Sequence, residues 1–179
     1  EGKAIMDYTM DGCPPIIGYA TGRGSSYSER CMKRNETVYA LVALNRYSYV
    51  ILAGSWPRDE KTGEQLSKSI EEILKTGSRL TVILANERID RASSCPVRRL
   101  MYNTSENCER PRIGPPPYFR EIENRFPSVH FLDPNQVLCR GNMCDPILDD
   151  TPLYRDDGHL NDIGARLIGR HLVSMGETI

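Results

Sequence analysis

The chain has 179 residues, of which 39% are hydrophobic and 26% charged, with a formal net charge of −1. This composition is typical of a soluble globular domain with a full-sized hydrophobic core, and it excludes an intrinsically disordered chain. Because the chain has no surplus of basic residues, nucleic acid is a poor candidate partner, and we expect no nucleic-acid partner. The longest apolar run, residues 49–54, is far too short to cross a membrane.

The first part of the chain contains two candidate strands and one candidate helix. Residues 3–8 form a short candidate strand, which Gly12-Cys13-Pro14-Pro15 breaks, and residues 20–30 are predicted to be a loop. Residues 47–53 predict a strand whose continuous apolar centre is typical of a buried parallel strand. Asn35 is expected to cap a helix with one face formed by Val38, Leu41, Val42 and Asn45.

The middle of the chain continues this alternation. A helical stripe ends at Gly77, which is suited to the C-cap, and the stripe consists of Leu66, Ile70, Ile73 and Leu74. Residues 80–85 form a second apolar strand pattern. The polar, proline-rich stretch that follows, residues 86–117, is too long for an ordinary connection, which predicts a functional or stapled surface loop.

The last part of the chain predicts two helices around a short strand. Residues 118–126 have a helical pattern, residues 129–132 a strand pattern, and residues 161–175 form the final helix. The residues expected to face inward from this helix are Leu160, Ile163, Leu167, Ile168 and Leu172. The order β-α-β-α-β-α-β-α predicts a three-layer α/β/α domain with a parallel sheet over residues 1–179. Because the pattern opens on a strand with no helix before it, we expect the central strand of the sheet to lie outside these residues.

Six cysteines are the most informative feature of the composition: Cys13, Cys31, Cys95, Cys108, Cys139 and Cys144. Successive pairs enclose 17, 12 and 4 residues, and an even count at short separations favours disulfides and an oxidising compartment. Zinc is the alternative, but there is no Cys-x-x-Cys and no histidine at ligand spacing, so we expect no metal. Pairing of nearest neighbours would close three local loops, at about 2–3 kcal/mol each in the chain-entropy model.

One short segment carries a catalytic pattern. Asp156 stands three residues before His159, on a turn that leads into the last predicted helix. A carboxylate at this spacing can accept a hydrogen bond from the imidazole Nδ1–H, which fixes the tautomer and leaves Nε2 free as a base. The alternative is a surface loop in which the aspartate caps the helix and the histidine is solvated. For Asp-x-x-His alone this alternative is favoured, so the surrounding sequence has to decide.

That surrounding sequence closely resembles a known family. The segment Tyr154-Arg155-Asp156-Asp157-Gly158-His159-Leu160-Asn161, followed by Gly164-Ala165-Arg166, resembles the terminal block of SGNH-fold hydrolases. It is most similar to the SGNH domains fused to the C-terminal end of membrane acyltransferase-3 proteins, the O-acetyltransferases of O-antigen and other surface glycans. Three further features resemble this family in order and spacing: Gly12-Cys13-Pro14-Pro15, the apolar strand and tryptophan of residues 49–56, and the paired Cys139 and Cys144.

The resemblance implies a flavodoxin-like SGNH domain in which Asp156 orients His159, and His159 acts as general base and then as general acid. The family's nucleophile is the serine of a Gly-Asp-Ser block that ends the first strand, before the Cys-Pro-Pro turn. This sequence contains no Gly-Asp-Ser. We therefore expect the catalytic serine and the first strand to belong to an N-terminal segment outside these 179 residues. Ser25, Ser26 and Ser28 follow the turn and are interpreted as loop residues.

The expected oxyanion hole departs from the family pattern. SGNH enzymes hold the developing oxyanion with a glycine of the second block and an asparagine of the third, whereas the strand here ends in Gly54-Ser55-Trp56 without that asparagine. The candidate donors are the backbone N–H of Gly54 or Ser55 and the indole N–H of Trp56. Plain packing is the equally weighted alternative for Trp56.

Four candidates are weaker. His130 lies in a strand pattern and is interpreted as a core or edge residue, and His171 is expected to border the apolar stripe of the last helix. Arg58 and Arg155 could contact a sugar or an anionic acyl donor, with plain solvation as the usual alternative for exposed arginines.

By resemblance, the serine takes an acyl group, most often acetyl, and passes it to a hydroxyl of a cell-surface or cell-wall glycan without a cofactor. The acyl donor is expected to arrive through a membrane-embedded acyltransferase domain, which makes this chain a periplasmic domain tethered to the bacterial inner membrane. A carbohydrate esterase uses the same residues with water as the acceptor. A non-catalytic glycan-binding or docking domain that keeps the SGNH shell is the hypothesis from another class.

Overall fold

A short parallel sheet organises the first of two units. The computed structural model describes residues 4–177. The first unit combines Glu1–Ile83 with Pro116–Phe131, and the second combines Leu84–Pro115 with Leu132–Ile179.

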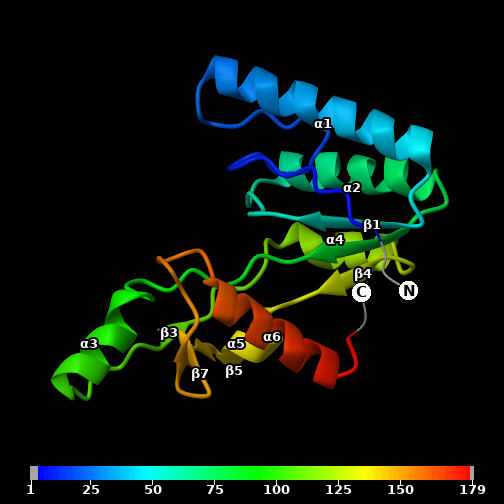
Figure 1. Cartoon of the computed structure of the whole chain (residues 1–179). Helices are drawn as coiled ribbons and strands as arrows, with labels where there is room; N and C mark the ends of the chain where they lie inside the picture. The colour runs from blue at the N-terminus through cyan, green and yellow to red at the C-terminus, as the bar shows by residue number, and fades with distance from the viewer. Residues whose placement is uncertain (1–3, 178–179) are drawn as a thin grey trace. The chain divides into compact units, whose positions relative to one another are not determined.

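The sheet has the strand order β1-β2-β4 (Figure 1). Strands β1 (Tyr49–Ala53) and β2 (Arg79–Ile83) pair in parallel along their whole length, and β4 (His130–Leu132) lies on the other side of β2. These strands confirm the predictions for residues 47–53, 80–85 and 129–132, with ends shifted by at most two residues. The buried side chains of the sheet include Leu52, Leu80, Val82 and Leu132.

Three helices accompany this sheet: α1 (Ser25–Asn45), α2 (Glu60–Leu74) and α4 (Tyr118–Arg125). Helix α2 packs against α1, α4 and β2, and α1 runs beside it in Figure 1. Asp59 caps α2 by accepting a hydrogen bond from the Thr62 N–H at 3.0 Å. The predicted stripe of α2 is confirmed, and Gly77 adopts a φ of +82° after the helix ends. Its innermost residues, each at most 1% exposed, are Leu66, Ile70 and Ile73.

Helix α1 corrects two predictions. It begins at Ser25, so residues 25–30 are helical rather than part of a loop, and Asn35 lies inside the helix rather than at its N-cap. Asn35 is fully buried, and its amide Nδ2 donates to the carbonyl oxygens of Pro14 at 2.8 Å and Ile16 at 2.9 Å. A residue that favours caps in isolated helices is used here to hold the turn before the helix, because its buried amide finds backbone partners there.

The predicted strand over residues 3–8 is wrong for its described part. Lys3 lies outside the described residues, and residues 4–8 have no regular secondary structure. Ile5 and Met6 are 88% and 61% exposed. An apolar alternating segment becomes a strand only where a neighbouring strand completes its hydrogen-bond ladder, and no strand within residues 4–177 pairs with this one.

The described residues of the second unit form three helices, α3 (Ser94–Tyr102), α5 (Asn135–Leu138) and α6 (Asp162–Ser174). The stretch predicted as a loop, residues 86–117, thus includes a nine-residue helix. Helix α6 confirms the predicted final helix and packs against α5. Ile168 and Leu172 are buried as expected, whereas Ile163 is 64% exposed and does not face inward.

Two small antiparallel sheets complete the second unit. In the first, β6 (Met143–Cys144) lies between β3 (Arg110–Pro111) and β5 (Cys139–Arg140). In the second, β7 (Ile147–Leu148) and β8 (Thr151–Pro152) form a hairpin. The mixed α/β fold with a parallel sheet, predicted from the alternating pattern, is therefore confirmed.

Three disulfides confirm the predicted nearest-neighbour pairing: Cys13–Cys31, Cys95–Cys108 and Cys139–Cys144. The first joins the Cys-Pro-Pro turn to α1, the second joins the start of α3 to the segment before β3, and the third links β5 to β6. Because each cysteine is in a disulfide, none is available as a zinc thiolate. Within residues 4–177, every helix is too short or too polar to cross a membrane.

Candidate functional site

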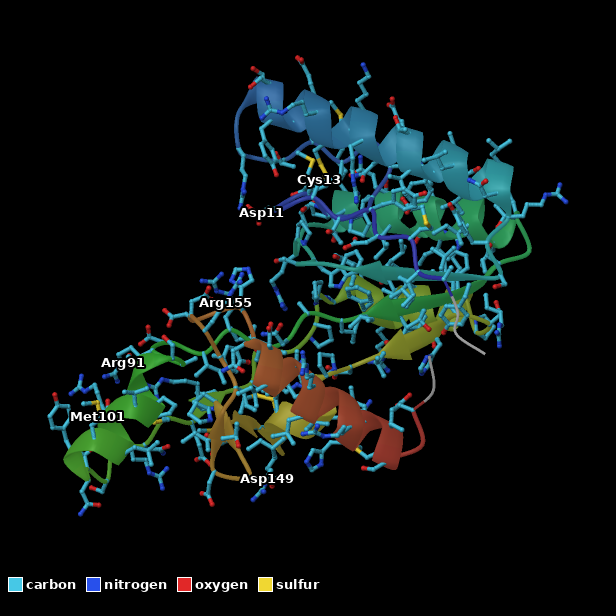
Figure 2. All side chains as sticks on the ribbon, in the orientation of Figure 1. Asp11, Cys13, Arg91, Met101, Asp149 and Arg155 are labelled. Carbon is cyan, nitrogen blue, oxygen red and sulfur yellow. A yellow bond between two sulfur atoms is a disulfide. The ribbon has the colours of Figure 1, made fainter. Side chains whose placement is uncertain are left out.

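Asp156 and His159 lie on a closed loop of the second unit, directly before α6. Tyr154 and Leu160 face each other across an antiparallel bridge that closes the loop. The Arg155 N–H donates to the carbonyl oxygen of His159 at 2.9 Å, so the backbone on both sides of the pair is hydrogen-bonded. Figure 2 labels Arg155, which marks this loop beside the start of α6.

The carboxylate of Asp156 is bonded to both the backbone and the imidazole of the loop. Its Oδ1 accepts from the N–H groups of Gly158 and His159, each at 2.8 Å. The His159 Nδ1 lies 2.9 Å from Oδ2 and 3.0 Å from Oδ1. A carboxylate accepts only, so the neutral imidazole carries its proton on Nδ1 and its lone pair on Nε2. The structure thus brings together the two residues that the sequence predicted as a pair.

These hydrogen bonds keep Asp156 ionised. The backbone N–H of Gly158 is the main cause that lowers the pKa of Asp156 from 3.8 to about 2, and the bonds to His159 add to it, while partial desolvation opposes them. The carboxylate is therefore negative at any physiological pH. A negative carboxylate at Nδ1 stabilises the imidazolium that forms when Nε2 takes a proton.

The Nε2 edge of the imidazole is open. The His159 side chain is 62% exposed, and within residues 4–177 its Nε2 has no hydrogen-bond partner. The neighbouring Asp157 differs, because the described residues give its carboxylate neither a hydrogen bond nor an ion pair. Its contribution is through the backbone, where its carbonyl oxygen accepts from the Ile89 N–H at 2.9 Å. Asp156 alone is therefore placed to orient His159.

A segment that follows β2 holds this loop, and sequence analysis missed it. The Asn86 amide donates to the Gly158 carbonyl oxygen at 3.1 Å, next to the bond from Ile89 to Asp157. Tyr154, which is 3% exposed, donates its hydroxyl to the Glu87 carbonyl oxygen at 2.7 Å. Burial raises the pKa of Tyr154 to about 12, which keeps this donor protonated. The only sequence signal for Asn86 was its position just beyond a parallel strand, where site residues often gather.

The start of α6 fixes the other side of the loop. Asn161 is the N-cap, and its Oδ1 accepts from the Gly164 N–H at 2.7 Å while its Nδ2 donates to the Pro152 carbonyl oxygen at 2.9 Å. A Cβ atom at Gly164 would lie 2.3 Å from the Leu153 carbonyl oxygen. Only glycine allows the helix to approach this backbone so closely. Asn161 and Gly164, which belong to the segment that resembles the SGNH family, therefore each have a structural role in the loop.

The residues predicted for an oxyanion hole belong to the first unit. Gly54 and Ser55 follow β1 and are exposed. Trp56 is 5% exposed, its indole N–H donates to the Ile83 carbonyl oxygen at 2.9 Å, and its ring packs edge-to-face on Phe119. Because the indole has a single N–H, this bond favours the packing interpretation of Trp56. The oxyanion role of Gly54 and Ser55 stays a prediction.

The weaker candidates have other surroundings. His130 Nδ1 lies 3.3 Å from the Thr81 hydroxyl on the neighbouring strand. His171 Nε2 lies 3.1 Å from the Asp149 carboxylate, in the same unit as His159. Arg155 approaches Asp156 only to 3.8 Å, and Arg58 lies just before the cap of α2. The serines after the turn, Ser25, Ser26 and Ser28, form the first turn of α1 instead of the predicted loop.

A basic trough lies elsewhere in the first unit. Its volume is about 590 Å³, and it lies between residues 7–9 and the middle of α1, with Arg30, Lys33 and Arg34 along its wall. Desolvation is the main cause that lowers the pKa of Arg34. None of the predicted site residues lines this trough, so it is assigned no part in the chemistry of Asp156 and His159.

Comparisons with known proteins identify the family of the chain. The sequence matches the model of one family, described as the SGNH domain fused to AT3 domains, over residues 1–174. Among solved structures it is similar to the periplasmic domain of a lipopolysaccharide acetyltransferase from Salmonella ser. Paratyphi A. That similarity has a TM-score of 0.62 and 15% identity, and it covers 92% of this chain and 69% of the other. At this identity the likeness shows the fold alone. No curated protein matches the sequence.

Proposed function

The chain belongs to the family of SGNH domains fused to AT3 domains, and we propose on this premise that it acts on glycans by acyl transfer or ester hydrolysis. The more specific proposal is O-acetyl transfer to a cell-surface or cell-wall glycan. The observation that carries it is the ionised Asp156 at the Nδ1 side of His159, with Nε2 open. We also propose that residues 1–179 form most of one SGNH-type domain, since the family match extends through both units.

The proposed reaction uses His159 twice. In the first step His159 Nε2 removes the proton of a serine hydroxyl, the serine Oγ bonds to the acyl carbon of the donor, and the donor's leaving group departs with the proton from Nε2. In the second step Nε2 takes the proton of a glycan hydroxyl, the glycan oxygen bonds to the acyl carbon, and the serine leaves and recovers its proton. Asp156 stabilises the imidazolium in both steps.

The nucleophile is proposed to be the serine of the family's Gly-Asp-Ser block, which this sequence does not contain. The proposal therefore assigns it to a segment outside these 179 residues. The acyl donor is proposed to arrive through the fused AT3 domain. Three disulfides support an oxidising compartment, and the similar structure is a periplasmic domain. Together these support a periplasmic domain tethered to the inner membrane.

The exposed site suits a bulky acceptor. A histidine that is 62% exposed can be approached by a glycan, and the similar structure comes from a lipopolysaccharide acetyltransferase. The same exposure admits water, so hydrolysis of the acyl-serine is the competing reaction. A non-catalytic glycan-binding role is the remaining alternative, and it requires no imidazole base.

The test uses the full-length protein, AT3 domain included, in cells that make the glycan. His159→Ala is compared with His171→Ala, a second histidine of the same unit that also contacts a carboxylate. Ester-linked acetate on the extracted glycan is measured by proton NMR. We expect acetylation to be lost in His159→Ala and kept in His171→Ala. Normal acetylation in a folded His159→Ala protein would rule out the catalytic proposal and favour the binding role.

A further inference from the structure

Helix α3 presents an apolar stripe that no described residue covers. Val97, Leu100 and Met101 recur at positions i, i+3 and i+4, which places them on one side of the helix. Their exposed fractions are 44%, 71% and 70%, and Tyr102, the last residue of the helix, is 68% exposed. Figure 2 labels Met101 on this helix. Large apolar side chains gathered on one short helix mark an interaction surface more often than isolated exposed ones do.

The other side of α3 is firmly anchored. Cys95 is fully buried and joined by its disulfide to Cys108, on the segment that returns toward β3. Glu106 on the same segment pairs with Arg91 at 2.7 Å and with Arg98 at 3.7 Å. These bonds hold the first turn of the helix and brace its flank. The apolar stripe is therefore presented by a stapled element.

The segment of the chain that contains this stripe is positively charged, whereas the chain is negative overall. The segment 86–117 contains six arginines and no lysine against four acidic residues, a net charge of +2, whereas the whole chain has −1. Within residues 4–177 Arg99, in the last turn of α3, forms no ion pair. A guanidinium binds phosphate oxygens through two parallel N–H donors, which makes arginine the usual choice for phosphate-bearing surfaces.

From this combination we propose that α3 docks on the surface of a phospholipid membrane that contains anionic headgroups. Leu100 and Met101 enter the boundary between headgroups and acyl chains, Tyr102 lies at the headgroup level, and Arg99 contacts a lipid phosphate. The positive charge favours an anionic lipid surface over an apolar protein groove as the partner. This inference does not depend on the catalytic role of His159, and it concerns a surface that the proposed reaction does not use.

Vesicle binding tests the proposal, with the 179 residues joined to the N-terminal segment that is proposed to complete the sheet. Co-sedimentation compares phosphatidylcholine vesicles with vesicles that contain phosphatidylglycerol as well. We expect binding to the anionic vesicles only, weakening as salt is added. The double variant Leu100→Ser with Met101→Ser should bind about tenfold more weakly, because it removes most of the inserted apolar surface. Its matched control is Ile163→Ser with Val173→Ser, which removes exposed apolar side chains from α6 of the same unit and should change nothing. No binding to either vesicle, or equal loss in both double variants, would overturn the proposal.

A photo-crosslinking residue in the full-length protein separates lipid from protein partners. With p-benzoylphenylalanine in place of Tyr102, irradiation of intact membranes should give an adduct with phospholipid. The same substitution at the exposed Ile163 is the control and should give no lipid adduct. An adduct between the residue at position 102 and a polypeptide, such as the AT3 domain, would overturn the lipid proposal and identify the stripe as a protein interface.

Discussion

Replacing Asp156 by asparagine is expected to abolish acyl transfer while leaving the fold intact. The asparagine Oδ1 can still accept from the N–H groups of Gly158 and His159, which lie 2.8 Å from the carboxylate oxygen, so the loop keeps its backbone bonds. Its Nδ2 is a donor, however, and the imidazole must then present its Nδ1 lone pair to it. The ring proton moves to Nε2, and the base required for the serine hydroxyl is lost.

The expected loss is large and has an internal control. In a serine hydrolase triad, replacing the orienting aspartate by the isosteric asparagine lowers kcat by a factor of about 10⁴. A loss of this size would take acetylation of the glycan below detection. Asp157→Asn makes the same charge change one residue away, at a carboxylate that makes no hydrogen bond or ion pair within residues 4–177. It should retain nearly full activity, measured as ester-linked acetate on the glycan.

Nitrogen-15 NMR of the histidine side chains would test the physical reason directly. The neutral ring of His159 should carry its proton on Nδ1 in the original protein and on Nε2 in Asp156→Asn. Equal damage from Asp157→Asn, or an active Asp156→Asn protein with the unchanged tautomer, would refute this assignment of the orienting carboxylate.

Further predictions concern the site and its supports. Asn86→Asp removes the amide donor to the Gly158 carbonyl oxygen at nearly constant side-chain volume. It should lower the free energy of unfolding by about 1 kcal/mol and lower the rate of acyl transfer. An unchanged thermal midpoint and an unchanged rate would contradict this prediction. Gly164→Ala should destabilise by about 1–3 kcal/mol in urea denaturation, because its Cβ would meet the Leu153 backbone. Gly169→Ala, on the same helix with nothing within 4 Å, should instead stabilise by about 0.5–1 kcal/mol. The carboxyl carbon-13 signal of Asp156 should titrate near pH 2. Because folding lowers the pKa of Asp156, the ionised carboxylate stabilises the folded chain above about pH 4, and this stabilisation is lost as the pH falls through about 2.

Sequence patterns located the elements whose signals are local. The apolar stripe of α2 and the short apolar strands depend on spacing within one segment, and both were predicted with small shifts at the ends. The disulfides followed the same rule, because each closes a loop between nearest cysteines. Each of these features is determined by residues close together in the chain, which is why periodicity and spacing were sufficient.

The errors arose where a distant partner decides the structure. Asparagine is a residue type that favours helix N-caps, but the carbonyl groups that bind the Asn35 amide belong to Pro14 and Ile16, outside its helix. Residues 4–8 have a strand pattern without a paired strand among the described residues. Helix α3 was hidden by the prolines around it, yet Pro96 lies in its first turn, where the missing N–H removes no helical hydrogen bond.

The candidate site combines both kinds of information, and this explains which part of it was predictable. The contact between Asp156 and His159 joins residues three positions apart, so a turn geometry alone could predict it. The support of that turn comes from Asn86, 72 positions before the carbonyl group it binds, and from Tyr154, whose hydroxyl bonds a carbonyl 67 positions away. A solvated Asp-x-x-His loop has the same local pattern without such support. What separates a catalytic pair from that loop is therefore the fixed backbone beneath it, and only the fold supplies this.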